Sequence, residues 1–306
     1  MDTPGVAKEV DARIAFASAV TQAPVIDGKL DEECWKAAVP FSGFRLSHDN
    51  LLAAPLQASF RALYDEKAIY LGIEIMLPGA GQVREDLKAK PLLGGDGNPL
   101  DKTGDVYAAR HSVEVFIQPP DRSRYVLYVA SLDGYRYDGC GLDGAWNGQW
   151  TCGTSAGEDR WCLEMMIPAA DLQLEKIPST EGWRLNIIVN SESNYSTWSA
   201  VGHDFHNPFA FGALVTKDFP QWRADKMKEW TVARKQAADN AHKPGLMFGD
   251  RLTRTEAFTQ TLPETTGGGD FGWEKITPVC ALMNFVDAAY RSMLAEIRYA
   301  DFFANE

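Results

Sequence analysis

The chain has 306 residues, which allows one large domain or one domain with a substantial extension. Its composition, 45% hydrophobic and 24% charged, is ordinary for a soluble globular protein and argues against a disordered chain. The formal net charge of −12 argues against nucleic acids and anionic membrane surfaces as partners, because both are bound through clustered Lys and Arg side chains.

The first predicted elements are a strand and a short helical turn. Residues 12–19 alternate loosely between apolar and polar side chains, which indicates a strand. Asp27-Gly28 is a turn signal. Asp31 follows it, and we expect this residue to cap a helical turn that buries Trp35.

From residue 56 onward the pattern predicts short strands separated by turns. Residues 56–64 and 68–75 form a predicted hairpin that turns at 65–67. Residues 78–105 are rich in Gly and Pro and are predicted to form a long loop. Further strands are predicted at residues 111–118, 124–131, 134–138, 150–155, 160–167, 183–190 and 211–216.

Short strands at regular spacing, without a helical period between them, predict a mostly β fold, an antiparallel β-sandwich over residues 1–217. Residues 218–306 are predicted to form a helical extension. Within it, residues 221–242 are compatible with a helix, residues 261–272 are a Gly/Thr/Pro-rich linker, and residues 278–303 carry apolar side chains at the spacing of one buried helix face. Two helices are too few for a core of their own, so we expect them to pack on the sandwich, on a second copy in a homodimer, or on another protein.

Five cysteines are present, and no two of them form a CxxC pair, which argues against a zinc ribbon. Cys140 and Cys152 bracket a short polar loop, while Cys152 and Cys162 lie on neighbouring predicted strands. One disulfide among these three is an open alternative, and the odd count favours buried free thiols for the others.

Two segments combine the side chains that a sugar ligand needs. Glu114 is embedded in the apolar strand of residues 110–119, and Trp198 stands in a polar loop that we expect to be exposed. An indole can stack on the apolar face of a pyranose, while carboxylates and amides bind its hydroxyl groups in fixed directions. Asn190 and Asn194, on the approach to Trp198, are further candidates.

Both main candidates also have a purely structural interpretation. Trp198 would then be an edge aromatic covered by the C-terminal helices. Glu114 would be a strand carboxylate paired with Arg110 or with a calcium ion.

Segments spread in order over residues 20–217 form a family pattern. They are Pro24–Gly28 with Trp35, Tyr64–Glu66 with Ile69–Leu71, Ser112–Phe116, Trp161 with Glu164, Ile167-Pro168, Trp183 with Asn186, Ser196–Ser199, and Phe211-Gly212. In these segments the chain resembles the family 9 carbohydrate-binding modules and the wider DOMON-like group of β-sandwiches.

The resemblance implies a module that holds the reducing end of a glycan between two aromatic side chains, beside an acid, amides and structural calcium. It implies that Trp198 is one aromatic wall and Glu114 the acid. A second aromatic is expected about six residues before Glu114, where Tyr107 can take its place if the loop shifts by one residue, and His111 stands where the family has an acid. No organic cofactor is implied.

Acidic side chains gather in the Gly-rich loop and around the next predicted turn. Such oxygen-rich loops suit calcium, although the spacing of an EF-hand is absent. The acidic residues are Asp96, Asp101, Asp105, Asp133, Asp138 and Asp143. We take Asp105, Asp133 and Asp138 as candidate calcium ligands. His203 and His206, with His111, are a weaker candidate for a transition-metal site.

We therefore expect a non-catalytic carbohydrate-binding protein that works beside polysaccharide-degrading enzymes. One alternative is a glycosidase with Glu114 and Glu164 as paired carboxylates. Others are a haem-binding domain with Met76, Met165 or Met166 as ligands, or a structural module without a ligand. The sequence contains no Ser–His–Asp signature, P-loop or nucleotide-binding Gly motif, which favours a protein that is not an enzyme.

The chain carries no apolar run near the ~20 residues that span a bilayer, so we expect no membrane insertion. Residues 1–5 lack the basic start and apolar stretch of a signal peptide. We expect a periplasmic or extracellular protein whose leader has been removed, and a cytoplasmic location stays open.

Overall fold

The computed structural model describes most of the first 217 residues and two later ones. The described residues are 13–47, 53–91, 93, 110–120, 124–191, 194–199, 201, 204–217, 222 and 228.

Strands dominate the described part of the chain. They are β1 (Ile14–Ala19), β2 (Arg45–Leu46), β3 (Ala58–Tyr64), β4 (Ala68–Met76), β5 (Ser112–Gln118), β6 (Val126–Ser131), β7 (Arg136–Cys140), β8 (Thr151–Ala156), β9 (Arg160–Pro168), β10 (Trp183–Ser191), β11 (Asn194–Thr197) and β12 (Gly212–Val215). The helical elements are α1 (Glu33–Ala37), α2 (Ala80–Lys88) and the short 3-10 turns η2 (Ala169–Leu172) and η3 (Pro208–Ala210).

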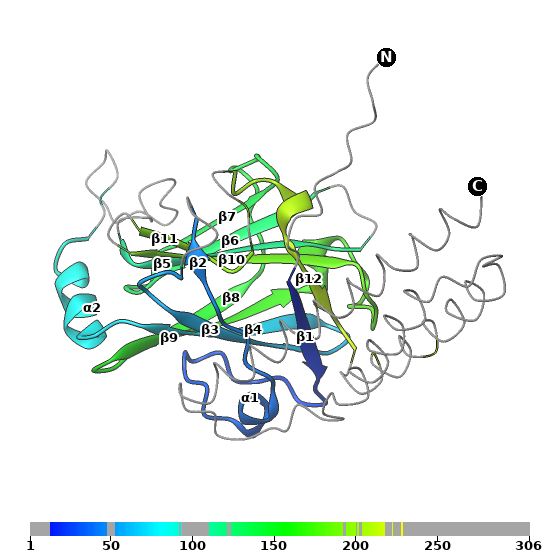
Figure 1. Ribbon diagram of the computed structural model, residues 1–306, viewed down its shortest axis with the longest axis horizontal. Coiled ribbons are helices and arrows are strands. Elements are labelled where there is room, and N and C mark those ends of the chain that lie inside the picture. The colour runs from blue at the N-terminus through cyan, green and yellow to red at the C-terminus, as the bar shows by residue number, and fades with distance from the viewer. Residues whose placement is uncertain are drawn as a thin grey trace, which may run out of the picture.

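The strands form one curled sheet in the order β7-β6-β5-β10-β12-β1-β3-β4-β9-β8, with β11 added beside β10 and β2 beside β11. Figure 1 shows β7, β6, β5 and β10 above β3, β4 and β9, with β1 and β12 at one side. We call β7, β6, β5, β10 and β12 the upper half, and β3, β4, β9 and β8 the lower half.

Strand β1 joins the two halves. Its residues 14–16 run parallel to β12, and its residues 17–19 run parallel to β3. The other strand pairs in the described residues are antiparallel. The predicted mostly β fold is therefore confirmed, but the sheet is mixed, because one strand serves both halves.

The two halves share one hydrophobic core. Because side chains alternate along a strand, Val115 of β5 and Leu163 of β9 face the same cluster from opposite halves. The outer face of the upper half carries a second cluster around Phe116, and the outer face of the lower half carries a third around Trp35. Both outer faces are therefore partly covered.

The segment before α1 is held on the lower half by Glu164 of β9. One carboxylate oxygen of Glu164 accepts the backbone N–H groups of Asp27 at 2.8 Å and Gly28 at 2.7 Å, and the other accepts the indole N–H of Trp35 at 2.7 Å. Glu164 is fully buried. Burial raises the pKa of Glu164, while the three N–H donors act in the opposite direction.

Two glycines beside Glu164 let this segment come close to the sheet. Gly72 of β4 and Gly153 of β8 flank Glu164 directly in register. A Cβ on Gly153 would lie 2.7 Å from the backbone of Asp27, and a Cβ on Gly72 would lie 2.5 Å from Leu30. A larger residue at either position would push the segment away from the carboxylate.

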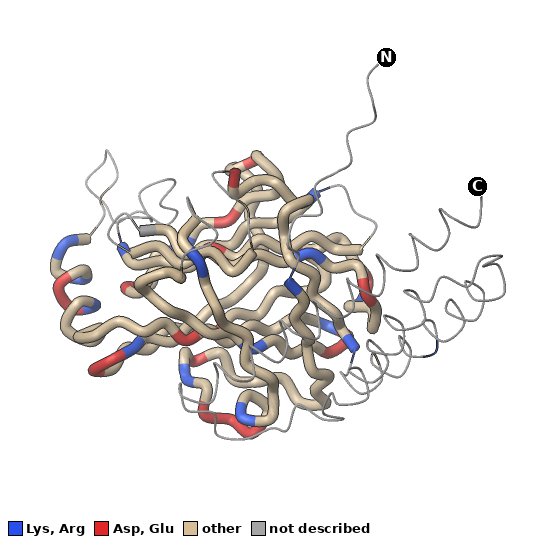
Figure 2. Tube along the Cα trace, in the orientation of Figure 1, with Lys and Arg blue, Asp and Glu red and all other residues tan. Residues whose placement is uncertain are grey.

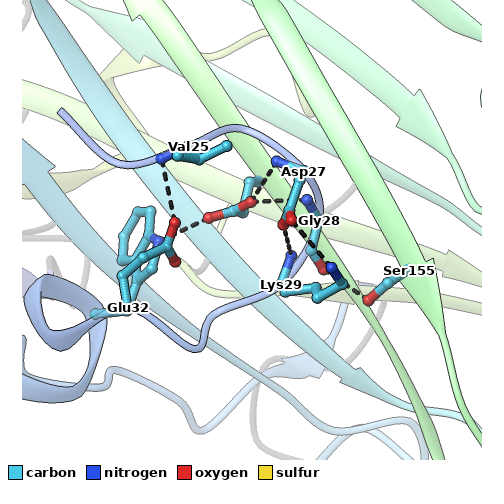
Figure 3. A network of polar contacts seen from close by, with 8 residues as sticks. Val25, Asp27, Gly28, Lys29, Glu32 and Ser155 are labelled. Carbon is cyan, nitrogen blue, oxygen red and sulfur yellow. Dashed lines mark hydrogen bonds and ion pairs between the residues drawn. The ribbon is translucent and has the colours of Figure 1, made fainter.

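Helix α1 buries Trp35 as predicted, but the predicted cap by Asp31 is wrong. The N-cap residue is Glu32, and it makes no side-chain capping bond. Glu32 instead accepts the backbone N–H of Val25 at 3.1 Å, which ties the start of the segment to the start of the helix (Figure 3).

The predicted loop at residues 78–105 is wrong over part of its length, because residues 80–88 form α2. The glycines there serve the packing of the helix. The N–H of Gly81 donates to the carbonyl of Gly157 at 2.8 Å, and Val83 and Leu87 pack against the core. The end of this predicted loop lies outside the described residues.

Of the predicted extension over residues 218–306, the structure describes Trp222 and Lys228. Trp222 is 4% exposed, belongs to the shared core and lies edge-on to Phe16 of β1, with ring centroids 5.0 Å apart. The rest of the predicted extension, with most of both helices, lies outside the described residues, so the predicted domain boundary at residue 217 stays a prediction.

Charged residues concentrate on α1, α2 and the turns, while the strands consist largely of other residues (Figure 2). In the part of the chain that the structure describes, no helix is long and apolar enough to cross a membrane.

The disulfide left open among Cys140, Cys152 and Cys162 is not formed, and Cys34 is also free. Burial raises the pKa of Cys152 to about 11 and that of Cys162 to about 12. Both thiols are therefore protonated at neutral pH.

Glu164→Gln is expected to lower the free energy of unfolding by about 2–3 kcal/mol, because an amide N–H₂ would replace one of the two acceptor oxygens. Urea unfolding followed by tryptophan fluorescence measures the change. Glu158→Gln, on the exposed turn before β9, is the matched control and should stay within about 0.5 kcal/mol of the parent. Equal midpoints for the two variants would contradict an anchoring role for Glu164.

Cys152 and Cys162 are expected to react with dithionitrobenzoate at pH 8 at least about 100-fold more slowly in the folded protein than in urea, because only the thiolate attacks. The rate should rise with pH as the thiolate fraction grows. Single Cys→Ser variants assign the slow phases. Reaction of both thiols at the rate of the unfolded chain would show that they are not buried.

Candidate functional site

The outer face of the upper half carries a polar group where β5 begins and β10 ends. Ser112 and Glu114 share this face of β5, and Asn190 of β10 lies opposite Ser112 in register. Val113 and Val115 point to the other face of β5 and enter the shared core. The three polar side chains therefore lie together on this face, with apolar Val129 and Ile188 on either side of Glu114.

Asn190 uses both of its N–H groups within this polar group. It donates to the carboxylate of Glu114 at 2.8 Å and to the hydroxyl of Ser112 at 3.1 Å. These two bonds fix the orientation of the amide, because the reverse orientation would place its oxygen against a carboxylate.

The carbonyl oxygen of Asn190 is buried and has no hydrogen-bond partner among the described residues, and the residue is 1% exposed. A buried acceptor without a donor costs about 1–3 kcal/mol. This oxygen therefore has an unused acceptor position that a water molecule or another donor could fill.

Two aromatic side chains stand beside this acceptor. Tyr195 of β11 lies opposite Asn190 in register, on the side away from Ser112. Its ring contacts that of Phe205 at 5.6 Å, and both side chains are half-buried against the outer cluster around Phe116. Tyr195 and Phe205 were not among the predicted site residues, although the alternation in residues 194–197 is the signal of a strand that presents Tyr195 to this face.

The residues before β5 are held by other partners. Arg110 forms a buried ion pair with Asp133 and donates to the carbonyl oxygens of Leu87 at 2.7 Å and Lys90 at 2.9 Å. The anticipated alternative of an Arg110–Glu114 pair is therefore wrong. Arg110 instead fixes the C-terminal end of α2 to the start of β5.

His111 is buried and takes a left-handed backbone conformation with φ of 51°, which is uncommon for a residue other than Gly. Its Nδ1 lies 2.9 Å from the hydroxyl of Ser191, the residue after Asn190. The structure thus brings His111 to the end of the polar group, with one ring nitrogen engaged by Ser191.

The exposure predicted for Trp198 is wrong. The side chain is 2% exposed, belongs to the shared core and meets the ring of Phe60 edge-on at 5.1 Å. A Cβ on Gly212 would lie 2.5 Å from the indole. The structural interpretation therefore holds for this residue, with Phe60 of the lower half as its cover.

The two remaining candidate ligand residues are Tyr107 and Asn194. Tyr107 lies outside the described residues. For Asn194 the structure describes the backbone, which pairs with Ser191 at the end of β11.

The candidate calcium ligands are engaged by the protein. Asp133 accepts the hydroxyl of Ser131 at 2.7 Å in addition to its ion pair with Arg110. Asp138 is buried and accepts the indole N–H of Trp150 at 2.9 Å, and the same oxygen accepts a backbone N–H.

No three His, Cys, Asp or Glu side chains in the described ranges are grouped so that they could hold a metal ion. Asp105 lies outside the described residues, so the calcium site that the resemblance implies stays a prediction. Among the histidine candidates for a transition-metal site, His203 also lies outside the described residues. His206 is hydrogen-bonded to Tyr125, with 2.6 Å between its Nδ1 and the tyrosine hydroxyl oxygen.

The carboxylate pair of the glycosidase alternative does not form. Glu114 lies on the outer face of the upper half, whereas Glu164 lies on the outer face of the lower half, where Trp35 and the adjacent turn occupy both its oxygens. The haem candidates are divided in the same way, since Met165 is in the shared core and Met166 packs on the outer cluster around Trp35.

No family model matches the sequence, and no curated protein is similar to it. Among solved structures, the chain is similar to a protein from Bacteroides uniformis that is proposed to bind carbohydrate. The TM-score is 0.50 and the sequence identity is 16%, and the match covers 67% of this chain and 100% of that chain. It is also similar to a family 9 carbohydrate-binding module from Caldicellulosiruptor kristjanssonii, solved with glucose and with cellotriose, at a TM-score of 0.46 and 17% identity. Those two matches cover 67% of this chain and 96% and 94% of the module. The first likeness confirms the fold that the sequence resemblance implies.

Trp198→Ala is expected to destabilise the protein by about 3–5 kcal/mol, because it empties a packed site between the two halves. Phe209→Ala is the matched control, since Phe209 is 83% exposed and its removal should leave stability nearly unchanged. Thermal and urea unfolding of both variants measure the difference. A Trp198→Ala protein as stable as its parent would show that the indole is not part of the core.

Proposed function

We propose that this chain is a non-catalytic carbohydrate-binding protein whose site is the outer face around Glu114, Asn190 and Tyr195. The observation that carries the proposal is the buried carbonyl oxygen of Asn190, which has no donor among the described residues and lies between a carboxylate and an aromatic pair. A sugar supplies what this arrangement lacks, because its ring carries several O–H donors around an apolar face.

The proposed binding mode divides the ligand between two kinds of contact. One hydroxyl donates to Asn190 Oδ1 and a neighbouring hydroxyl donates to Glu114, whose charge makes that bond stronger than one between neutral groups. The C–H face of the sugar lies against Tyr195 and Phe205, which take the role first expected of Trp198 and Tyr107.

Binding without hydrolysis is favoured by the separation of the acids. Hydrolysis of a glycosidic bond by the usual route needs two carboxyl groups on either side of that bond. Glu114 and Glu164 face away from each other across the curled sheet, and Glu164 is fully engaged in holding the segment before α1.

The setting we infer is outside the cytoplasm, beside enzymes that degrade polysaccharides. The support is the family resemblance of the sequence and the fold shared with a protein proposed to bind carbohydrate. A structural module that has lost its ligand is the competing outcome of the following experiment.

Glu114→Gln is expected to weaken sugar binding at least about tenfold, since a bond to a charged acceptor contributes about 1.5–3 kcal/mol. Isothermal titration calorimetry with glucose, xylose, cellobiose and xylobiose, in calcium and in EDTA, measures it. Tyr195→Ala should weaken the same sugars by removing the apolar wall.

Glu158→Gln, on the opposite half of the sheet, is the matched control and should bind as the parent does. No heat with any of these sugars would overturn the proposed function. Binding that is equal in the parent and in both Glu114→Gln and Tyr195→Ala would place the sugar elsewhere.

A further inference from the structure

We propose that the extension over residues 218–306 docks on the curled sheet of its own chain, with Trp222 as its anchor. The sequence alone leaves three partners open for this extension: the β fold of the same chain, a second copy and another protein. The first is favoured by the burial of Trp222, by its position on β1 and by the short connection from β12. A chain cut after residue 217 would therefore lack part of its core.

Trp222 is buried to the same degree as the residues of the strands. It is 4% exposed and belongs to the shared core, to which both halves of the sheet contribute side chains. Its ring meets that of Phe16 edge-on, with centroids 5.0 Å apart and an interplanar angle of 69°. Because an indole buries a large apolar area, this contact ties the segment that carries Trp222 to the sheet.

The contact lies at the junction between the two halves. Phe16 is the last residue of β1 that pairs with β12, where its partner is Val215. The next residue, Ala17, pairs with Ala62 of β3. Strand β1 therefore changes its partner directly beside the ring that Trp222 contacts, and docking at this point stabilises the connection between the halves.

The connection to Trp222 is short and starts from a fixed point. The side-chain oxygen of Thr216 accepts the backbone N–H of Thr180 at 3.0 Å and the indole N–H of Trp183 at 3.1 Å. Five residues lie between Thr216 and Trp222, so the connection spans at most about 20 Å. A short connection gives the anchor a high effective concentration at its own sheet, which favours docking within one chain over docking on a second copy.

The anchor and the candidate site lie at opposite ends of β10. Phe16 pairs with Val215 at the end of β12, and the preceding residue of β12 pairs with Trp183 at the start of β10. Asn190 lies seven residues further along β10, which corresponds to about 23 Å. Figure 1 shows β1 and β12 at the right of the view and β11, which pairs with the Asn190 end of β10, at the left. Docking through Trp222 therefore does not require the extension to cover the candidate site.

Trp222→Ala in the full chain is expected to lower the melting temperature by about 10 °C, because it empties a packed site in the core. Phe209→Ala, which removes an aromatic side chain at 83% exposure, is the matched control and should melt within about 1 °C of the parent. Trypsin gives a local readout, since cleavage after Arg223 and Lys226 should be at least about tenfold faster in Trp222→Ala than in the parent. If Trp222→Ala does not fold, Trp222→Phe provides the same comparisons with a smaller loss.

Protein concentration separates docking within one chain from exchange between two chains. Melting curves and sedimentation velocity of the parent over about a hundredfold range of concentration make this comparison. A monomer with one melting temperature throughout, which Trp222→Ala lowers, supports the proposal. A dimer whose melting temperature rises with concentration, and which Trp222→Ala dissociates, would show that Trp222 enters a second copy and would overturn it. Melting and trypsin cleavage that Trp222→Ala leaves unchanged would overturn it as well.

Discussion

The three N–H bonds to Glu164 are the constraint on which the arrangement of the lower half depends. They hold Asp27, Gly28 and Trp35 against the sheet. The segment can approach this closely because Gly72 and Gly153, which flank Glu164, have no side chains. The same segment follows β1 directly, so anchoring it also helps to position the strand that joins the halves. β1 pairs with β12, β12 with β10, and β10 carries Asn190, which connects the buried acid to the candidate site by a continuous series of strand pairs.

The candidate site owes its character to the alternation of side chains in β5 and β10. One side of these strands supplies Val113, Val115 and Ile187 to the core, and the other supplies Glu114 and Asn190 to the outer face. The polar group is buried, yet its hydrogen bonds leave one acceptor over. An unsatisfied buried oxygen lowers stability, so this acceptor needs a donor that the described residues do not supply.

Much of the fold could be predicted from the sequence, because strand alternation and turn residues are local signals. The hairpin of β3 and β4 and the burial of Trp35 in a short helix are examples. The burial of Trp198 could not be predicted, since it depends on Phe60, which is distant in sequence and lies on the other half of the sheet. The unused acceptor oxygen of Asn190 could not be predicted either. It depends on how hydrogen bonds are shared among three side chains and not on the residue types alone.

The alternation in β5 and β10 also has a consequence for how such a protein diverges. Substitutions on the outer face can change its chemistry while the inward-facing residues continue to satisfy the core, so the character of the surface and the folding of the chain can evolve under nearly separate pressures. A lineage that exchanges the side chains of one face would keep its architecture while losing the residues by which sequence comparison detects kinship. That is consistent with a chain that shares its fold with a solved structure at 16% identity.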